Sequence, residues 1–230
     1  DLGNAYGAGA SALSFHENSY TAYFQPGKKL HDPTTLLKID PPIFNMTLQN
    51  EVTTGSANSG DKVWIYGSEY SQFQAARGTV PLEVEAFPIR GAIPNPPEVC
   101  ANLLMRHLAQ KKIFVEKNVF ELSASKQTRI HTTFSPQVKE IVYWTNQKSI
   151  NLYAEHLLKK MGEVVYGEGS TASGIRAVFG FLEEKGVDVK GFYMADGSGL
   201  SRKNRISAKQ LTSLLCKMKE SPLFPIFLRS

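Results

Sequence analysis

The sequence predicts an α+β protein, with a β-rich first part and a mostly helical second part. Three observations support this. Before residue 95, aromatic and Thr-rich runs alternate with Gly- and Pro-rich stretches, as strands alternate with turns. From Pro96 onward, apolar residues recur at helical spacing. After residue 133, residues that favour helix starts and glycines that favour helix ends bracket these apolar segments.

Composition excludes several classes of protein. Of the 230 residues, 42% are hydrophobic and 20% are charged, as in soluble globular proteins. No segment approaches the ~20 consecutive apolar residues of a membrane span. The first residues lack the basic leader and the apolar run that are typical of a signal peptide. A mature secreted protein, whose signal peptide has been removed, would also lack them. The net charge is +5, and residues 198–230 hold seven Lys/Arg against one acidic residue. No aromatic-and-basic motif accompanies them, so we interpret them as a solvated helix face and expect no nucleic-acid partner.

The first part contains strand-like runs and one polar loop. The runs are rich in Tyr, Phe, Val and Thr and cover residues 20–27, 62–78 and 80–91. Residues 50–62 are polar and rich in Gly, Ser and Asn, which predicts a loop. Residues 96–112 then predict a helix, and residues 113–130 predict two short strands.

Two helices with recognisable ends are predicted next. Ser135 is a favoured N-cap and Pro136 suits a first helical position, so we expect a helix to begin there. A second helix covers residues 149–161, and Gly162 follows it as a left-handed C-cap.

Two further helices follow. The apolar residues of the third lie within residues 175–182, and Gly186 ends it. Residues 191–201 predict a short strand that runs into a Gly-rich turn. Ser207 and Gln210 form a capping box at the start of the last helix.

Ser149 and Asn151 stand two residues apart where the second helix begins. Ser and Asn are preferred N-caps, because their side-chain oxygens accept hydrogen bonds from the first free backbone N–H groups. A pair this short also arises often by chance. Taken alone, the pair therefore favours a helix cap over a chemical role.

Two longer stretches accompany the pair. Residues 6–13 read Tyr-Gly-Ala-Gly-Ala-Ser-Ala-Leu, and residues 196–202 read Asp-Gly-Ser-Gly-Leu-Ser-Arg. Together with residues 148–151 (Lys-Ser-Ile-Asn), they resemble motifs of the penicillin-binding D-alanyl-D-alanine carboxypeptidases of low-molecular-mass class C, peptidase family S13. The resemblance covers essentially the whole chain. It implies that residues 1–133 are a β-rich inserted accessory region. Residues 134–230 would be part of a penicillin-binding domain with the β-lactamase/transpeptidase-like fold.

The resemblance implies a serine-type acyl-enzyme mechanism. In this family the serine of a Ser-x-x-Lys motif attacks the D-Ala-D-Ala carbonyl, its lysine activates it, and a Lys-Thr-Gly motif binds the substrate carboxylate. Carried over by motif, Ser149 is catalytic and relays a proton to the leaving D-alanine. Asn151 is catalytic and substrate-binding, because it binds the substrate backbone and helps to orient that lysine. Lys148 is a candidate substrate contact or a solvated lysine. Water completes the reaction, so no cofactor and no metal are expected.

The Asp196 stretch has a local interpretation of its own. Gly197 and Gly199 would supply unusual backbone angles in a tight turn, and Asp196 would cap that turn. No chemical role follows from these residues.

The chain departs from the family's pattern in two ways. Position 150 is Ile where the family usually has Asp or another polar residue, and we expect Ile150 to pack with the apolar stripe of its helix. No Lys-Thr-Gly occurs, and Ser-x-x-Lys occurs only at residues 59–62 and 123–126, where the family has no nucleophile. We interpret both matches as chance. The chain then reads as an internal piece of a longer carboxypeptidase, which we hypothesise is inactive alone.

The implied substrates of the parent protein are peptidoglycan stem peptides, with endopeptidase cleavage of cross-links as a further candidate activity. β-Lactams would acylate it, and its location would be extracytoplasmic, in the bacterial periplasm or cell envelope. The five histidines show no metal-ligand spacing. The alternative is a non-catalytic module that binds peptidoglycan or an envelope protein. A serine β-lactamase is a closer rival, and the stretches at residues 6–13 and 196–202 argue against it. The oligomeric state stays open.

Overall fold

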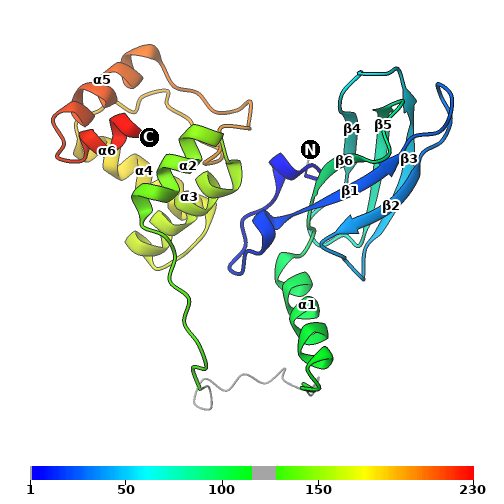
Figure 1. Ribbon diagram of the computed structural model, residues 1–230. Helices are drawn as coiled ribbons and strands as arrows, with labels where there is room; N and C mark the ends of the chain where they lie inside the picture. The colour runs from blue at the N-terminus through cyan, green and yellow to red at the C-terminus, as the bar shows by residue number, and fades with distance from the viewer. Residues whose placement is uncertain (1, 116–127) are drawn as a thin grey trace.

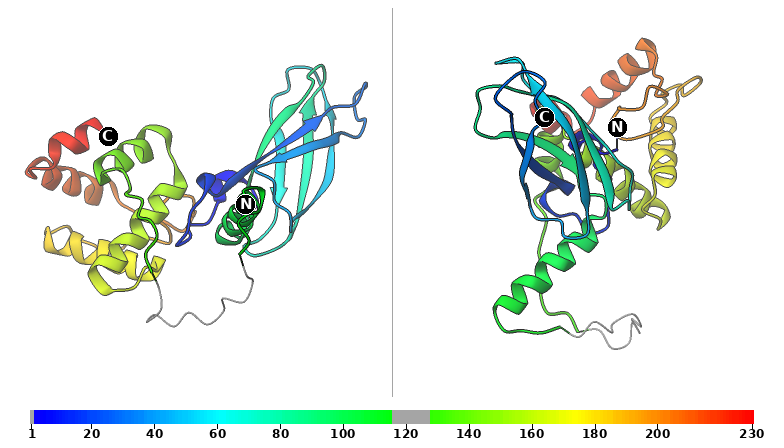
Figure 2. Two further views of the ribbon diagram at one scale, coloured as in Figure 1. Left: turned by 60° about the horizontal axis from the view of Figure 1, so that its bottom comes forward. Right: turned by 90° about the vertical axis from the view of Figure 1, so that its right-hand side faces the viewer.

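The computed structural model describes residues 2–115 and 128–230 and confirms the α+β class. Within these residues, the strands lie in the first part of the chain and α2–α6 in the second (Figure 1). The N-terminal segment lies between the two parts, as two further directions of view also show (Figure 2). The division into domains at residue 133 stays a prediction.

The first sheet has the order β2-β1-β6 and is antiparallel. Its strands are β1 (Ser19–Gln25), β2 (Thr35–Asp40) and β6 (Phe87–Ala92). Alternate residues of β1 face opposite sides. Tyr20, Ala22 and Phe24 are fully buried, whereas the residues between them are partly exposed. The strand expected in residues 20–27 is therefore confirmed.

The second sheet has the order β3-β5-β4, with β3 parallel and β4 antiparallel to β5. Its strands are β3 (Thr47–Gly55), β4 (Lys62–Tyr66) and β5 (Phe73–Pro81). The core lies between the two sheets, which present alternate apolar residues to each other. Besides the β1 residues, it contains Val52, Val63, Ile65, Ala76, Val80 and Ile89.

The loop predicted at residues 50–62 is wrong for its first half, because residues 50–55 belong to β3. Polar residues can face inward in this strand because their side chains form hydrogen bonds to a neighbouring segment of backbone. Asn50 Nδ2 donates to the Thr34 carbonyl at 2.7 Å, and Thr54 Oγ1 donates to the Asp32 carbonyl at 3.0 Å. Composition alone did not reveal these long-range partners.

A buried hydrogen-bonded pair joins the two sheets. The Tyr20 hydroxyl donates to Gln74 Oε1 at 2.5 Å, and Gln74 Nε2 donates to the Ala92 carbonyl at 3.0 Å. Both side chains are fully buried. Burial raises the pKa of Tyr20 above its ordinary value of 10.0, because the phenolate would lose its solvation.

Tyr20→Phe is expected to lower the free energy of unfolding by ~1–3 kcal/mol, because Gln74 Oε1 loses its donor while the ring stays in place. The tyrosine also confers a pH dependence. Its contribution is complete below pH ~10 and falls as the pH rises further, since the unfolded chain then releases the phenol proton more readily than the folded chain. Urea unfolding at pH 7 to 11 measures both effects. Identical pH profiles for the wild type and the variant would contradict this account.

Helix α1 (Pro96–Gln110) confirms the helix expected from residue 96. The Asn95 side chain caps it by accepting from the backbone N–H of Glu98, and Val99 is buried against the two sheets. The two strands expected in residues 113–130 fall largely outside the described residues. Residues 113–115 and 128–130, which are described, form no strand.

The second part contains five helices within the described residues. They are α2 (Val138–Lys148), α3 (Asn151–Tyr166), α4 (Thr171–Glu184), α5 (Ala208–Lys219) and α6 (Phe224–Arg229). The expected capping box of Ser207 and Gln210 is confirmed at α5. Gly186 takes the positive φ of 70° expected just after α4.

The expected start at Ser135 and Pro136 is wrong. Helix α2 begins at Val138, its N-cap is Gln137, and no side chain caps it. Residues 128–137 have no regular structure and are exposed. Because every residue from 131 to 137 is exposed, no packing against the rest of the protein supports an earlier start, and the local signal at Ser135 and Pro136 does not suffice.

The expected C-cap at Gly162 is also wrong, because α3 continues to Tyr166 and Gly167 (φ 74°) caps it. Gly162 is buried inside the helix. A Cβ there would lie 2.6 Å from the backbone nitrogen of Gly174 in α4. The glycine therefore allows two helices to approach closely and does not end one.

The strand expected within residues 191–201 does not form. This region holds a single antiparallel bridge between Tyr193 and Arg205. The chain bends at Gly191, whose φ is 77°, and again in the Asp196 turn. The intervening segment is too short for a strand with several paired residues.

Candidate active site

Helix α3 forms the floor of a groove of about 390 Å³, called the α3 groove below. Asn151, Glu155 and Lys159 line it, and their spacing of four residues places them on one face of the helix. One wall is the N-terminal segment, residues 6–10. The other wall is the Asp196 turn, residues 196–201. The three sequence stretches that carry the family resemblance therefore meet at one groove.

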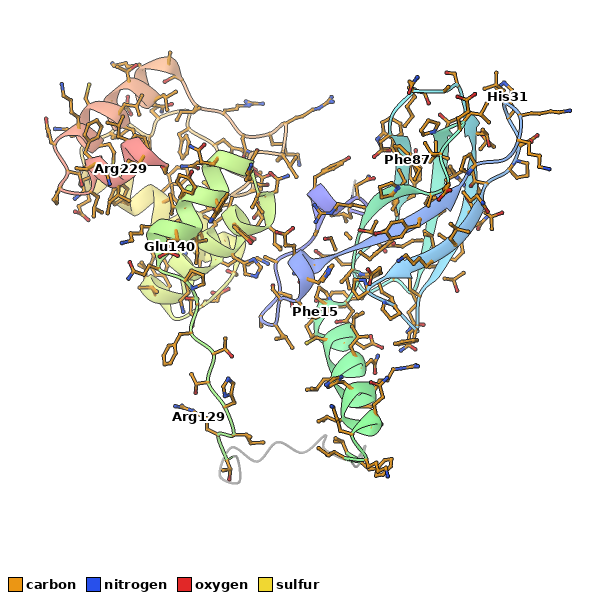
Figure 3. All side chains as sticks on the ribbon, viewed as in Figure 1. Phe15, His31, Phe87, Arg129, Glu140 and Arg229 are labelled. Carbon is orange, nitrogen blue, oxygen red and sulfur yellow. The ribbon has the colours of Figure 1, made fainter. Side chains whose placement is uncertain are left out.

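Side chains of α3 hold the N-terminal wall. Asn151 Nδ2 donates to the Tyr6 carbonyl at 2.9 Å, and Lys159 Nζ donates to the Ala10 carbonyl at 3.2 Å. Between them along the helix, His156 Nε2 lies 2.8 Å from Ser14 Oγ and 3.1 Å from the Ser11 carbonyl. Beyond Phe15 the segment turns away from α3 and leads into β1, which begins at Ser19 (Figure 3).

A carboxylate of α3 holds the opposite wall. Glu155 Oε1 accepts from the backbone N–H groups of Gly197 at 3.0 Å and Ser198 at 2.9 Å. Gly197 itself lies against the helix, because a Cβ there would be 2.8 Å from the Ala154 carbonyl. The unusual backbone angle expected at Gly197 is wrong: this glycine permits close approach, and Gly199 alone of the two has a positive φ, 80°.

The Asp196 carboxylate caps the turn as expected. It accepts from the backbone N–H of Gly199 at 2.9 Å and of Ser201 at 2.6 Å, and from Asn204 Nδ2 at 2.6 Å. Charge-assisted bonds of this kind fix the shape of the loop. The turn therefore forms a fixed wall of the groove. Asp196 fixes its internal shape, and Glu155 bonds it to α3.

The Ser149–Asn151 pair does not cap the helix. Ser149 is the C-cap of α2, exposed and in the left-handed conformation with φ 52°. Ile150 is the N-cap of α3, and no side-chain cap bond forms there. Asn151 is the first residue of the helix, and its amide bonds to Tyr6 on the other side of the groove. The helix-cap interpretation of the pair is therefore wrong.

Of the three candidate site residues, Asn151 lines the α3 groove. Ser149 and Lys148 lie next to it at the exposed end of α2 and are not among its lining residues. Ile150 is half-buried, in keeping with the expected packing. The roles of Ser149, Asn151 and Lys148 stay predictions.

The Ser-x-x-Lys match at residues 59–62 is not among the residues that line the groove. Ser59 lies in the loop after β3, and its hydroxyl is buried with no hydrogen-bond partner in the part of the chain that the structure describes. Lys62 is the exposed first residue of β4. The match at residues 123–126 lies outside the described residues.

Sequence reasoning missed Glu155 and Lys159. Their spacing from Asn151, four and eight residues, would have placed them on its helical face. Across residues 2–115 and 128–230, no group of three or more His, Cys, Asp or Glu side chains is arranged to hold a metal ion. None of the helices described there combines the length and apolar character needed to cross a membrane.

Comparison with known proteins first defines the class. The chain is 26% identical over 181 residues to a D-alanyl-D-alanine carboxypeptidase of Actinomadura sp. (strain R39), which covers 76% of this chain and 33% of that protein. It is 23% identical over 220 residues to D-alanyl-D-alanine carboxypeptidase DacB of Haemophilus influenzae, covering 94% of this chain and 45% of that protein. Both of these relatives are D-alanyl-D-alanine carboxypeptidases.

The family follows from a match over the whole chain. The D-Ala-D-Ala carboxypeptidase 3 (S13) family matches residues 1–230, so the chain belongs to peptidase family S13. The chain spans a third to about half of the length of the relatives that it matches.

Solved structures share the fold. The crystal structure of penicillin binding protein 4 (dacB) from Haemophilus influenzae matches with a TM-score of 0.71 and 18% identity, over 99% of this chain and 50% of that one. The same protein complexed with a novel β-lactam matches with a TM-score of 0.64 over 95% of this chain and 50% of that chain.

Proposed function

We propose that the full-length protein containing this chain is a serine-type D-Ala-D-Ala carboxypeptidase. It would remove the terminal D-alanine from peptidoglycan stem peptides, and the same chemistry would extend to cross-link cleavage. One observation carries the proposal: Asn151 points its amide across the α3 groove to the Tyr6 carbonyl instead of capping its helix. A carboxamide in that position can also bond to the backbone of a peptide laid along the groove.

The proposed reaction proceeds through an acyl-enzyme. The serine of the Ser-x-x-Lys motif attacks the carbonyl carbon of the penultimate D-alanine, and the motif's lysine accepts the serine proton. The peptide C–N bond then breaks, and Ser149 relays a proton to the nitrogen of the departing D-alanine. Water hydrolyses the ester and regenerates the serine. Asn151 holds the substrate backbone and orients the lysine during both steps.

We propose that this chain alone is inactive, since acyl transfer needs the nucleophile, the base and the carboxylate anchor together. Fluorescent penicillin followed by intact-mass measurement tests this on the chain and on the full-length protein. One adduct on the full-length protein alone supports both proposals. Labelling of neither protein contradicts the carboxypeptidase proposal. Labelling of this chain contradicts its inactivity, and Ser59 and Ser123 become the residues to map.

Asn151→Ala in the full-length protein is expected to slow penicillin acylation by ~10²–10³-fold, because a hydrogen-bond donor aimed at the substrate is lost. The same change removes a bond from α3 to the N-terminal wall. His156→Ala is the matched control, since it also removes contacts from α3 to that segment but does not line the groove. It should acylate at close to the wild-type rate. Equal rates for Asn151→Ala and the wild type would exclude a catalytic role for Asn151.

The proposed activity also implies which partners the protein has and where it is located. The substrate is a peptide of the cell wall, β-lactams are its acylating mimics, and the protein acts outside the cytoplasm, in the periplasm or envelope. The support comes from the family and from the named relatives, one of which was solved in complex with a β-lactam. Fractionation of the producing bacterium tests the location.

The binding-module alternative makes the opposite prediction for Asn151. It expects the full-length protein to retain peptidoglycan binding after Asn151→Ala and to show no penicillin adduct in any form. A β-lactamase would instead hydrolyse penicillin rapidly, so a long-lived adduct argues against it.

A further inference from the structure

A second groove of about 600 Å³ lies where the edge strands of the two sheets meet, and is called the seam groove below. β6 is the edge of the first sheet and β4 is an edge of the second. The N-terminal segment bridges them: the Ala92 N–H of β6 donates to the Gly3 carbonyl at 2.8 Å, and the Ile65 N–H of β4 donates to Asn4 Oδ1 at 3.0 Å. Residues 4–6 of this segment line the seam groove together with residues of β1, β4 and β6.

Exposed aromatic rings line the seam groove. Trp64 is 50% exposed, Tyr6 is 45% exposed, and Tyr23 is half-buried. Half-exposed aromatic rings offer apolar faces to a ligand at the surface. Polar side chains lie beside these rings in the groove. Arg90 and Asp61 also line the groove. Both recorded bonds of Arg90, to Glu17 and Ser19, use the single nitrogen Nη2, so its other donors have no partner among the described residues.

The backbone at the seam does not suit an added peptide strand. On β4, the Val63 N–H already donates to Asp61 Oδ1 at 2.9 Å and the Ile65 N–H to Asn4 Oδ1 at 3.0 Å. On β6, Pro88 has no N–H to donate. Strand addition depends on free main-chain groups at a sheet edge. A ligand of the seam groove must instead use ring faces and side-chain donors, which is how a pyranose binds: its apolar face stacks on an aromatic ring, and its hydroxyls bond to polar side chains.

Tyr6 connects the seam groove to the α3 groove. Its carbonyl accepts from Asn151 in the α3 groove, while the residue also lines the seam groove. The two grooves therefore share this residue, and a ligand long enough to occupy both would pass it. The substrate of the proposed function has this form, because stem peptides are attached to a glycan chain.

We propose that the seam groove binds the glycan strand of peptidoglycan, a polymer of N-acetylated hexosamines, with a sugar ring stacked on Trp64. The proposal rests on the proposed function for the identity of the polymer. Glycan bound here would hold the attached stem peptide near Asn151. The seam groove would thus favour polymeric substrate over free stem peptide.

Calorimetric titration of the full-length protein with peptide-free glycan strands tests this. Trp64→Ala is expected to weaken binding about tenfold or more, since truncating a central aromatic anchor typically has effects of this size. Tyr66→Ala is the matched control: Tyr66 lies two residues along β4, is 55% exposed and does not line the seam groove. It should bind glycan like the wild type.

Several results would overturn the proposal. One is that the wild type does not bind glycan. Another is that Trp64→Ala and Tyr66→Ala weaken glycan binding equally. A third is that Trp64→Ala also weakens the binding of free stem peptide. Penicillin acylation of the same variants keeps the two proposals apart. Trp64→Ala should acylate normally, so failure of acylation in all forms contradicts the enzyme, whereas normal acylation without glycan binding contradicts the seam groove alone.

Discussion

Ser149→Gly in the full-length protein is expected to slow acylation by ~10²–10⁴-fold through loss of a proton relay, and yet to make the protein more stable. Ser149 has a left-handed backbone with φ 52° at the end of α2. Glycine adopts this conformation without the penalty of a Cβ, so the free energy of unfolding should rise by ~1 kcal/mol. Strained backbone is tolerated at functional sites when the side chain is needed there.

Ser149→Ala separates the two effects. It removes the hydroxyl but keeps the Cβ, so acylation should fall as in the glycine variant without the gain in stability. Stopped-flow acylation by a chromogenic β-lactam and thermal unfolding measure both. Acylation at the wild-type rate in both variants would remove Ser149 from the mechanism.

Gly174→Ala is expected to lower the free energy of unfolding by ~2 kcal/mol, because an added methyl would press α4 against α3. The new Cβ would lie 2.8 Å from the carbonyl carbon and from Cγ of Leu158. Leu158 is fully buried, and backbone atoms cannot rotate away as a flexible side chain can. The helices would have to separate at their closest point.

Gly180→Ala is the matched control in the same helix. Among the described residues, no atom beyond its chain neighbours and the nearby backbone of its own helix lies within 4 Å of a Cβ at this exposed position, so the change should stabilise by ~0.5–1 kcal/mol through helix propensity. Glycine to alanine is therefore expected to lower the free energy of unfolding at position 174 and to raise it at position 180, six residues further along α4. Chemical unfolding of both variants measures the difference. Equal stabilities would show that the two helices do not approach closely at Gly174.

Local signals in the sequence predicted much of the fold. The capping box at Ser207 and Gln210 and the helix end at Gly186 were both predicted from residues within one turn, and both formed. The strand at residues 20–27 was predicted from its richness in aromatic residues and Thr. Failures occurred where distant segments supply the partners. Residues 50–55 form β3 because Thr34 and Asp32 satisfy its inward polar side chains.

Local signals likewise predicted only part of the candidate site. Its motifs were recognisable in sequence, including the turn that Asp196 caps. That Glu155 holds this turn, and that Asn151 and Lys159 hold the N-terminal wall, depends on contacts between residues more than 40 positions apart. No local pattern encodes which carbonyl or N–H group will lie opposite a side chain.

The sequence by itself determined the α+β class, several helix ends and the family to which the chain belongs, because these depend on residues close together along the chain or on long motifs. Only the tertiary structure decided that Ser149 and Asn151 are not a helix cap, and that Gly162 lies inside a helix. It alone placed Tyr6 between the α3 groove and the seam groove. The physical reason is that such roles are set by which distant backbone groups pack against a residue, and folding brings those groups together only after the local elements have formed.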